Sequence, residues 1–154
     1  MPGFDSSAFA ITLIVLLILA FPLIRIRRMR VSKRAREKIY GGAWAAADDF
    51  VSTEPEVDIP GCYIFLVFDR PIDQVEDFED HKEVYVGRGE KAYESACERL
   101  AEIEAQKKEE GPSDEPRYTY VQLRPYDLEV LPIREDSILK VFKLRGNWVK
   151  EDAQ

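Results

Sequence analysis

The fold is set by the stretch Gly61–Asp69, GCYIFLVFD. Every residue between the glycine and the aspartate is apolar, and aromatic and β-branched side chains dominate the run. A continuous apolar run of this length, bounded by turn-forming and polar residues, is typical of a buried strand. We therefore predict a buried strand here, with the other elements arranged around it.

The residues that follow alternate between strand and helix patterns. Arg70–Lys82 is acidic, has an early proline and predicts a loop. Glu83–Val86, EVYV, predicts a second short strand. Lys91–Glu110 predicts a helix, because its apolar residues recur at helical spacing on one face. The remaining elements are a third strand over Arg117–Arg124 and a second amphipathic helix over Arg134–Leu144.

This order of strand, strand, helix, strand and helix places the domain in the α/β class. We expect a small three-stranded sheet, mixed or antiparallel, flanked by helices, in a domain over residues 59–148 with a tail at 149–154. Two cysteines, Cys62 and Cys97, are too few for a disulfide-rich scaffold and are expected to be buried apolar groups. His81 lies in the acidic loop and is expected to be exposed to solvent.

A second apolar run, Ala8–Ile24, contains no charged residue. As a helix it would be about 25 Å long, near the lower limit for crossing a hydrocarbon core of about 30 Å. The alternative, a cleaved signal peptide, needs a basic segment before the run and a small-residue cleavage site after it. Here Asp5 precedes the run and Ile-Arg-Ile-Arg-Arg follows it at once. We therefore predict an uncleaved transmembrane anchor over residues 1–24, in contact with the membrane through residues 8–24.

Charge divides the chain into two parts. Residues 1–40 contain eight basic and two acidic residues, a net charge of +6, whereas residues 41–154 carry −13. Because basic residues favour the cytoplasmic side of a span, we predict a single-pass protein of the cell membrane with a cytoplasmic C-terminal domain. The basic segment either only sets this topology or also contacts anionic lipids. We expect a basic juxtamembrane helix and an acidic linker over residues 25–58.

Short motifs on the predicted elements carry a family resemblance. Gly61-Cys62-Tyr63 opens the first strand, and Tyr85-Val86-Gly87 ends the second strand before a helix. Glu135 begins the segment Glu-Asp-Ser-Ile-Leu on the helix after the third strand, and Gly146-Asn147 follows that helix. In order and spacing these motifs resemble those of the GIY-YIG nuclease family, over about residues 60–148.

The resemblance implies a domain that cleaves phosphodiester bonds, DNA being the candidate substrate, with Mg²⁺ or Mn²⁺. It implies that Glu135 is the single protein ligand of the metal, that Tyr63 is the general base or orients the attacking water, and that Tyr85 helps to orient the water or the phosphate. A hard divalent cation prefers carboxylate oxygen and keeps several waters, which suits a site with one carboxylate. A tyrosine with a pKa near 10 needs a nearby cation to become a useful base.

One position departs from the family pattern. The family places an arginine about eight residues after the second motif's glycine, to contact the scissile phosphate, and Ser95 stands there in this chain. Two residues are candidates for its role. Arg99 lies four residues further along the predicted helix, on the same face. Arg88 directly follows the motif glycine.

Two function hypotheses follow. The first is a metal-dependent nuclease at the membrane. The second is a catalytically inactive interaction module on the same fold, with a protein partner still to be identified. The domain's charge of −13 favours the second hypothesis, because proteins bind nucleic acid largely by neutralising phosphates with lysine and arginine.

Overall fold

The computed structural model describes residues 33–144. The chain divides between Gly41 and Gly42 into two units, which we describe separately. In the first unit residues 33–40 form a helix, and the N–H of Gly41 donates to the carbonyl of Glu37 at 2.8 Å. The helix therefore ends at the glycine pair Gly41–Gly42.

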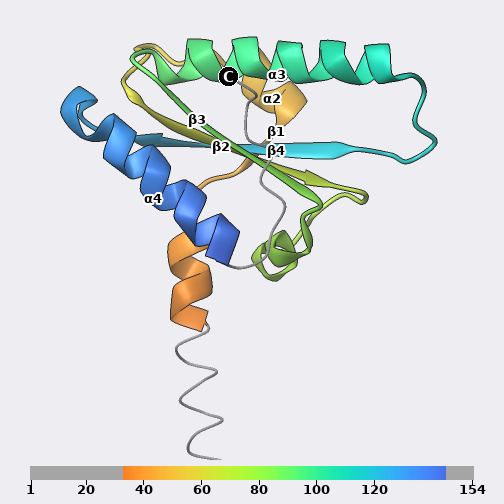
Figure 1. The fold of residues 1–154 in the computed structure, drawn as a ribbon, viewed down its shortest axis with the longest axis horizontal. Coiled ribbons are helices and arrows are strands. Elements are labelled where there is room, and N and C mark those ends of the chain that lie inside the picture. The colour runs from red at the N-terminus through yellow and green to blue at the C-terminus, as the bar shows by residue number, and fades with distance from the viewer. Residues whose placement is uncertain (1–32, 145–154) are drawn as a thin grey trace, which may run out of the picture. The chain divides into compact units, whose positions relative to one another are not determined.

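The second unit contains a four-stranded antiparallel sheet with the strand order β1-β4-β2-β3 (Figure 1). β2 pairs with β3 on one side and with β4 on the other, and every residue of β2 is buried. The prediction of a buried strand is thus confirmed. The strands are β1 (Ala45–Ala46), β2 (Gly61–Phe68), β3 (Glu83–Gly89) and β4 (Tyr118–Pro125).

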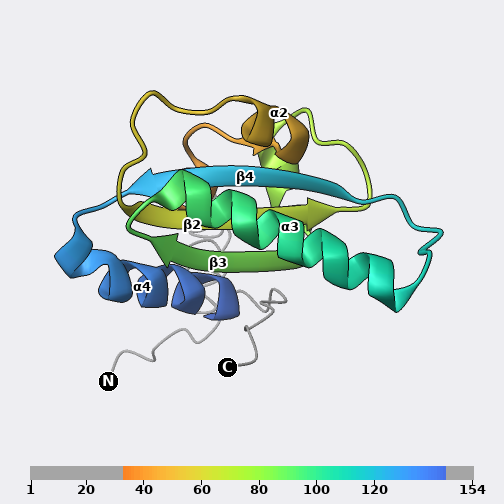
Figure 2. The same ribbon diagram turned by 90° about the horizontal axis from the view of Figure 1, so that it is seen from above.

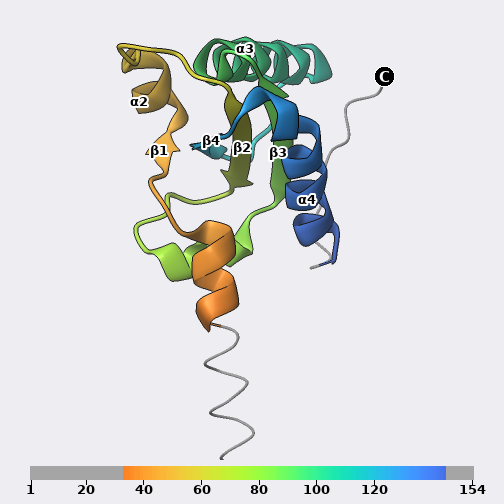
Figure 3. The same cartoon turned by 90° about the vertical axis from the view of Figure 1, so that its left-hand side faces the viewer.

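Helices cover both faces of this sheet, so the unit is of the α/β class. α3 (Ala92–Glu110) crosses β2 and β3 on one face, and the short α2 (Ala47–Ser52) packs against β4 (Figure 2). α4 (Leu131–Leu144) packs against β3 and β2 from a different side of the strands (Figure 3). Two short 3₁₀ segments, η1 (Val75–Asp80) and η2 (Leu128–Val130), complete the described elements of this unit.

The alternation of side chains along β2 separates two core layers. Tyr63, Phe65 and Val67 point to the side of α3 and form a cluster with residues of that helix. The intervening residues of β2 point to the side of α4, where Ile138 and Phe142 are buried. The first layer also contains Tyr85, Ala96, Leu100, Ile103 and Val121.

The sheet is larger than the sequence predicts, because β1 adds a fourth strand where we expect part of a linker. Ala45 pairs with Val121, and Ala46 pairs with Tyr120. A strand of two alanines has neither the alternation nor the β-branched residues by which strands are recognised in a sequence. The compact unit accordingly begins at Gly42 rather than near residue 59.

The expectation that His81 is exposed to solvent is wrong. Its side chain is buried, with its ring centroid 6.4 Å from that of Phe68 and 5.8 Å from that of Phe142. The Nδ1–H group donates to the carbonyl of Phe78 at 2.8 Å. Burial lowers the pKa of His81, since the charged imidazolium loses hydration there.

Within residues 33–144 the structure contains no helix that is both long and apolar enough to cross a membrane. The predicted anchor Ala8–Ile24 and the Gly146-Asn147 motif lie outside the described residues. Both therefore remain predictions from the sequence.

Candidate functional site

The first part of the site is the packing of Tyr63 on Gly87. These two residues face each other across the β2–β3 pair. A Cβ atom at position 87 would overlap the phenol ring of Tyr63, so the ring lies directly over the glycine. Only glycine permits this close approach, which holds the hydroxyl-bearing end of the ring above the edge strand β3. The two sequence motifs are thereby brought into contact.

The start of α3 is fixed against the same end of the sheet. Asp58 accepts hydrogen bonds from the N–H groups of Tyr93 and Glu94, at 2.9 Å each, and so satisfies unpaired donors of the first helical turn. A side chain at Gly89 would overlap Ser95. The position at which the family has its arginine is therefore used here for close packing of helix on strand.

Arg99 lies one turn further along α3, on the side of the two tyrosines. Its guanidinium carbon is 5.9 Å from the centroid of the Tyr85 ring, and its Nη1 is 2.9 Å from Oε2 of Glu102. The charge of Arg99 also acts on the Tyr63 hydroxyl. Of the two candidate arginines, Arg99 is therefore the one beside the tyrosines.

Arg88 lies on the other side of β3. It pairs with Cys62 in the strand register, so its side chain emerges on the α4 side of the sheet. There its Nη1 is 3.2 Å from Oε2 of Glu135, in an ion pair whose side chains are 44% and 24% exposed. Arg88 is thus the counter-ion of the predicted metal ligand. The structure does not place it beside the tyrosines, where an arginine that contacts the phosphate is expected.

Tyr85 belongs to a separate polar network. Its hydroxyl donates to Oε2 of Glu83 at 2.8 Å. Arg117 makes two hydrogen bonds to the same carboxylate, at 3.0 and 2.8 Å, and the Nζ of Lys107 is 3.4 Å away. The Tyr85 hydroxyl therefore already donates its hydrogen bond to a carboxylate. In this arrangement it does not point towards a substrate.

The pKa values reflect these surroundings. Burial raises the pKa of Tyr63; the positive charge of Arg99 opposes the rise, and the negative charge of Glu135 adds to it. Burial and the hydrogen bond to Glu83 raise the pKa of Tyr85 to about 12. Burial alone would raise the pKa of Glu83, but the hydrogen bonds from Arg117 and Tyr85 outweigh it and lower the pKa to about 2. Both tyrosines are therefore protonated at neutral pH.

Glu135 would offer a metal ion one carboxylate, which is paired with Arg88. Among residues 33–144 no three His, Cys, Asp or Glu side chains are placed to share a metal ion. A Mg²⁺ or Mn²⁺ ion at Glu135 would therefore keep water in its other positions, as Mg²⁺ commonly does. The carboxylate is partly exposed and its ion pair with Arg88 joins it through Oε2, so a cation from solution can reach it.

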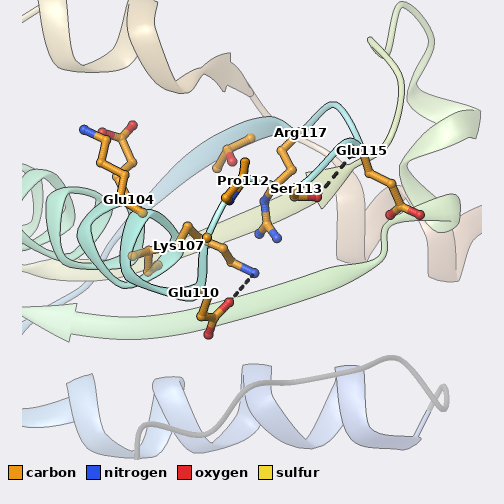
Figure 4. Close-up of a pocket in the computed structure, with 11 residues that line it drawn as sticks. Glu104, Lys107, Glu110, Pro112, Ser113, Glu115 and Arg117 are labelled. Atoms are coloured by element: carbon orange, nitrogen blue, oxygen red, sulfur yellow. Dashed lines mark hydrogen bonds and ion pairs between the residues drawn. The ribbon is translucent and has the colours of Figure 1, made fainter.

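A separate cavity of about 720 Å³ lies at the far end of α3 (Figure 4). Its lining comes from the end of α3, the following loop and the start of β4, and includes Lys107, Glu110 and Arg117. Because Lys107 and Arg117 both hold Glu83, two of the three basic residues of this cavity already have a structural partner. We therefore place the candidate site at the Tyr63 end of the strands and not here.

Sequence reasoning missed Glu83, Arg117 and Asp58. Glu83 stands two residues before Tyr85, so the two share one side of β3, and this spacing was the available signal. Arg117 is 34 residues from Glu83, and nothing in the sequence links the two. Asp58 lies in the segment expected to be a linker, 35 residues before the helix turn that it caps.

Comparison with protein-family models, with curated proteins and with solved structures found no match. The resemblance to the GIY-YIG family therefore remains a prediction, carried by the motifs and by their arrangement in space.

Proposed function

We propose that this domain cleaves phosphodiester bonds as GIY-YIG nucleases do, with Tyr63, Arg99 and Glu135 as its working residues. One observation carries the proposal: the Tyr63 ring lies over Gly87, and on the same side of the sheet the guanidinium carbon of Arg99 is 5.9 Å from the centroid of the Tyr85 ring. Two motifs and a cation thus meet at one end of the sheet, although their residues are far apart in the sequence.

Each group has a chemical role in this proposal. The Tyr63 hydroxyl stays protonated because of its raised pKa, and it orients the attacking water by hydrogen bonding. Arg99 neutralises the non-bridging oxygens of the scissile phosphate. Glu135 would hold the divalent cation, which would stabilise the negative charge that develops on the leaving oxygen. Arg88 balances the charge of Glu135 through its ion pair.

The location follows from the sequence. We propose that Ala8–Ile24 anchors the chain in the cell membrane and that the basic residues after it keep the domain on the cytoplasmic side. The substrate would then be nucleic acid that comes close to the membrane.

A cleavage assay on the full chain in detergent micelles, with Mg²⁺ or Mn²⁺, tests the proposal. We expect Glu135→Ala to lower the rate by about 100-fold and Arg99→Gln by about 10-fold or more, as for the loss of electrostatic groups in other enzymes. Lys91→Gln removes the same charge from an exposed position just before α3 and should leave the rate unchanged. No cleavage by the wild type, or equal cleavage by Glu135→Ala, would reject the proposal.

A second candidate is an inactive interaction module. It is favoured by the Arg88–Glu135 ion pair, which neutralises the proposed metal ligand, and by the Glu83 network, which occupies the hydroxyl of Tyr85. The same assay separates the two candidates, because a module of this kind binds its partner without cleaving phosphodiesters.

A further inference from the structure

A cavity of about 950 Å³ lies where β4 leads into α4. This junction of the two elements is at the left-hand side of Figures 1 and 2. Its wall includes Ile59 and Leu128, two large apolar side chains that are 48% and 51% exposed. Tyr126 also lines it, and the N–H of Tyr126 donates to the carbonyl of Pro60 at 3.1 Å. The guanidinium carbon of Arg134 is 5.3 Å from the centroid of the Tyr126 ring. The cavity thus combines apolar surface with an aromatic ring and a guanidinium group that lies over it.

This cavity is next to the candidate site. Gly61 pairs with Pro125 in β4 and with Gly89 in β3, so the lining residue Pro125 lies at the same end of the sheet as Gly87 and its partner Tyr63. Arg134 directly precedes Glu135 on α4. If a ligand has a phosphate beside Glu135, the part of the ligand that is bonded to that phosphate therefore lies at the mouth of this cavity.

The cavity is lined by one basic residue, Arg134, and by two acidic residues. Arg88 and Arg124 both act on the buried thiol of Cys62, and Arg124 also interacts with Tyr126. Together with Arg134 they place three arginines around the start of α4. Two carboxylates, Asp127 and Glu129, line the same cavity and can accept hydrogen bonds.

We propose that this cavity binds an unpaired nucleobase next to the scissile phosphate, an inference that rests on the proposed nuclease function. Aromatic rings and guanidinium planes are the groups on which single-stranded bases stack, as Tyr126 and Arg134 can here. Asp127 or Glu129 accepts a hydrogen bond from an exocyclic amino group of the base. A long duplex offers no unpaired base and brings many phosphates against an acidic surface, so the preferred substrate is single-stranded.

Fluorescence anisotropy of labelled oligonucleotides tests this site without cleavage, with the full chain in detergent micelles and EDTA present. We expect a short single strand to bind about 10-fold more tightly than a duplex of the same length. Arg134→Gln and Tyr126→Leu should each weaken binding of the single strand by about 5- to 10-fold, from the usual range for loss of base stacking. Tyr126→Phe keeps the ring and should bind as the wild type does.

Lys140→Gln is the matched control, because it removes the same charge from an exposed position on α4, where Lys140 pairs with Asp136. Equal binding of single strand and duplex, or no larger loss for Arg134→Gln than for Lys140→Gln, overturns the base site. If the chain cleaves while Arg134→Gln binds normally, the base site fails and the nuclease stands. If the chain binds single strands through Tyr126 but does not cleave, the base site stands and the nuclease fails.

Discussion

The two ends of the β2–β3 pair each hold a tyrosine, a carboxylate and an arginine, but they connect these groups differently. At one end Glu83 receives hydrogen bonds from Tyr85 and Arg117, and its side chain is 17% exposed. At the other end Glu135 has an ion pair with Arg88 at 3.2 Å and is 24% exposed. Its neighbour Tyr63 packs on glycine rather than on a carboxylate. Similar residues thus form several hydrogen bonds to one carboxylate at the first end, which we call the closed end, and a single ion pair at the second, which we call the open end.

The comparison distinguishes a carboxylate that stabilises the fold from a carboxylate that can bind another cation. A carboxylate that accepts several charge-assisted hydrogen bonds is strongly stabilised as the anion and is costly to disturb. A partly exposed ion pair contributes little to stability, and its partner can be exchanged for another cation. We therefore propose a stabilising role for Glu83 and a functional role for Glu135.

The largest effect on stability is expected at the closed end. Glu83→Gln leaves the charges of Arg117 and Lys107 without their shared counter-ion, and should lower the free energy of unfolding by about 3 kcal/mol. Glu98→Gln, on the exposed side of α3, is the control and should change it by less than about 0.5 kcal/mol. Urea denaturation followed by tryptophan fluorescence measures both. Equal stability of the two variants would mean that Glu83 has no structural role.

The free energy of unfolding should depend on pH through the same carboxylate, Glu83. The pKa of Glu83 is about 2 in the folded chain, below its ordinary value of 4.5, so its stabilising effect is present above pH 4.5 and is lost as the pH falls towards 2. We expect this to remove about 2–3 kcal/mol between these pH values. In Glu83→Gln this part of the pH dependence should be missing. Parallel stability curves for the variant and the wild type would contradict the assignment.

A smaller loss is expected from Gly87→Ala, because the added methyl group overlaps the Tyr63 ring and forces it to move. We expect about 2 kcal/mol of destabilisation, within the range for overpacked sites, together with loss of any cleavage. A double-mutant cycle with Tyr63→Ala is the control, since the alanine leaves room for the methyl group. If Gly87→Ala is equally harmful in both backgrounds, the contact with Tyr63 is not its cause.

The smallest effect on stability is expected at the ion pair of the open end. Arg88→Gln should change the free energy of unfolding by less than about 1 kcal/mol, as for other exposed pairs. Because Arg88 and a metal ion compete for Glu135, the same variant should bind Mn²⁺ about 5-fold more tightly, which titration calorimetry measures. Lys140→Gln should bind Mn²⁺ as the wild type does. Weaker binding by Arg88→Gln would mean that Arg88 supports the metal site rather than competing for it.

The sequence predicts the large periodic elements of this domain well. The apolar run of β2 and the helical spacing of α3 each specify their element to within one residue, because burial imposes those patterns. β1 could not be predicted, since it is a strand only through its pairing with β4. The candidate site was found by its motifs, but the choice between Arg88 and Arg99 depends on which side of β3 each one reaches. That choice depends on strand register and helix placement, which no local pattern encodes.

The most direct test of the two-ended arrangement compares Tyr63→Phe with Tyr85→Phe in the metal-dependent cleavage assay on the full chain. Each variant removes one hydroxyl and keeps the ring. We expect Tyr63→Phe to lower the cleavage rate by about 100-fold, and Tyr85→Phe to lower stability while keeping the rate within about 3-fold of the wild type below its unfolding transition. A loss in Tyr85→Phe as large as that in Tyr63→Phe, or a Tyr63→Phe variant that cleaves normally, would contradict the account.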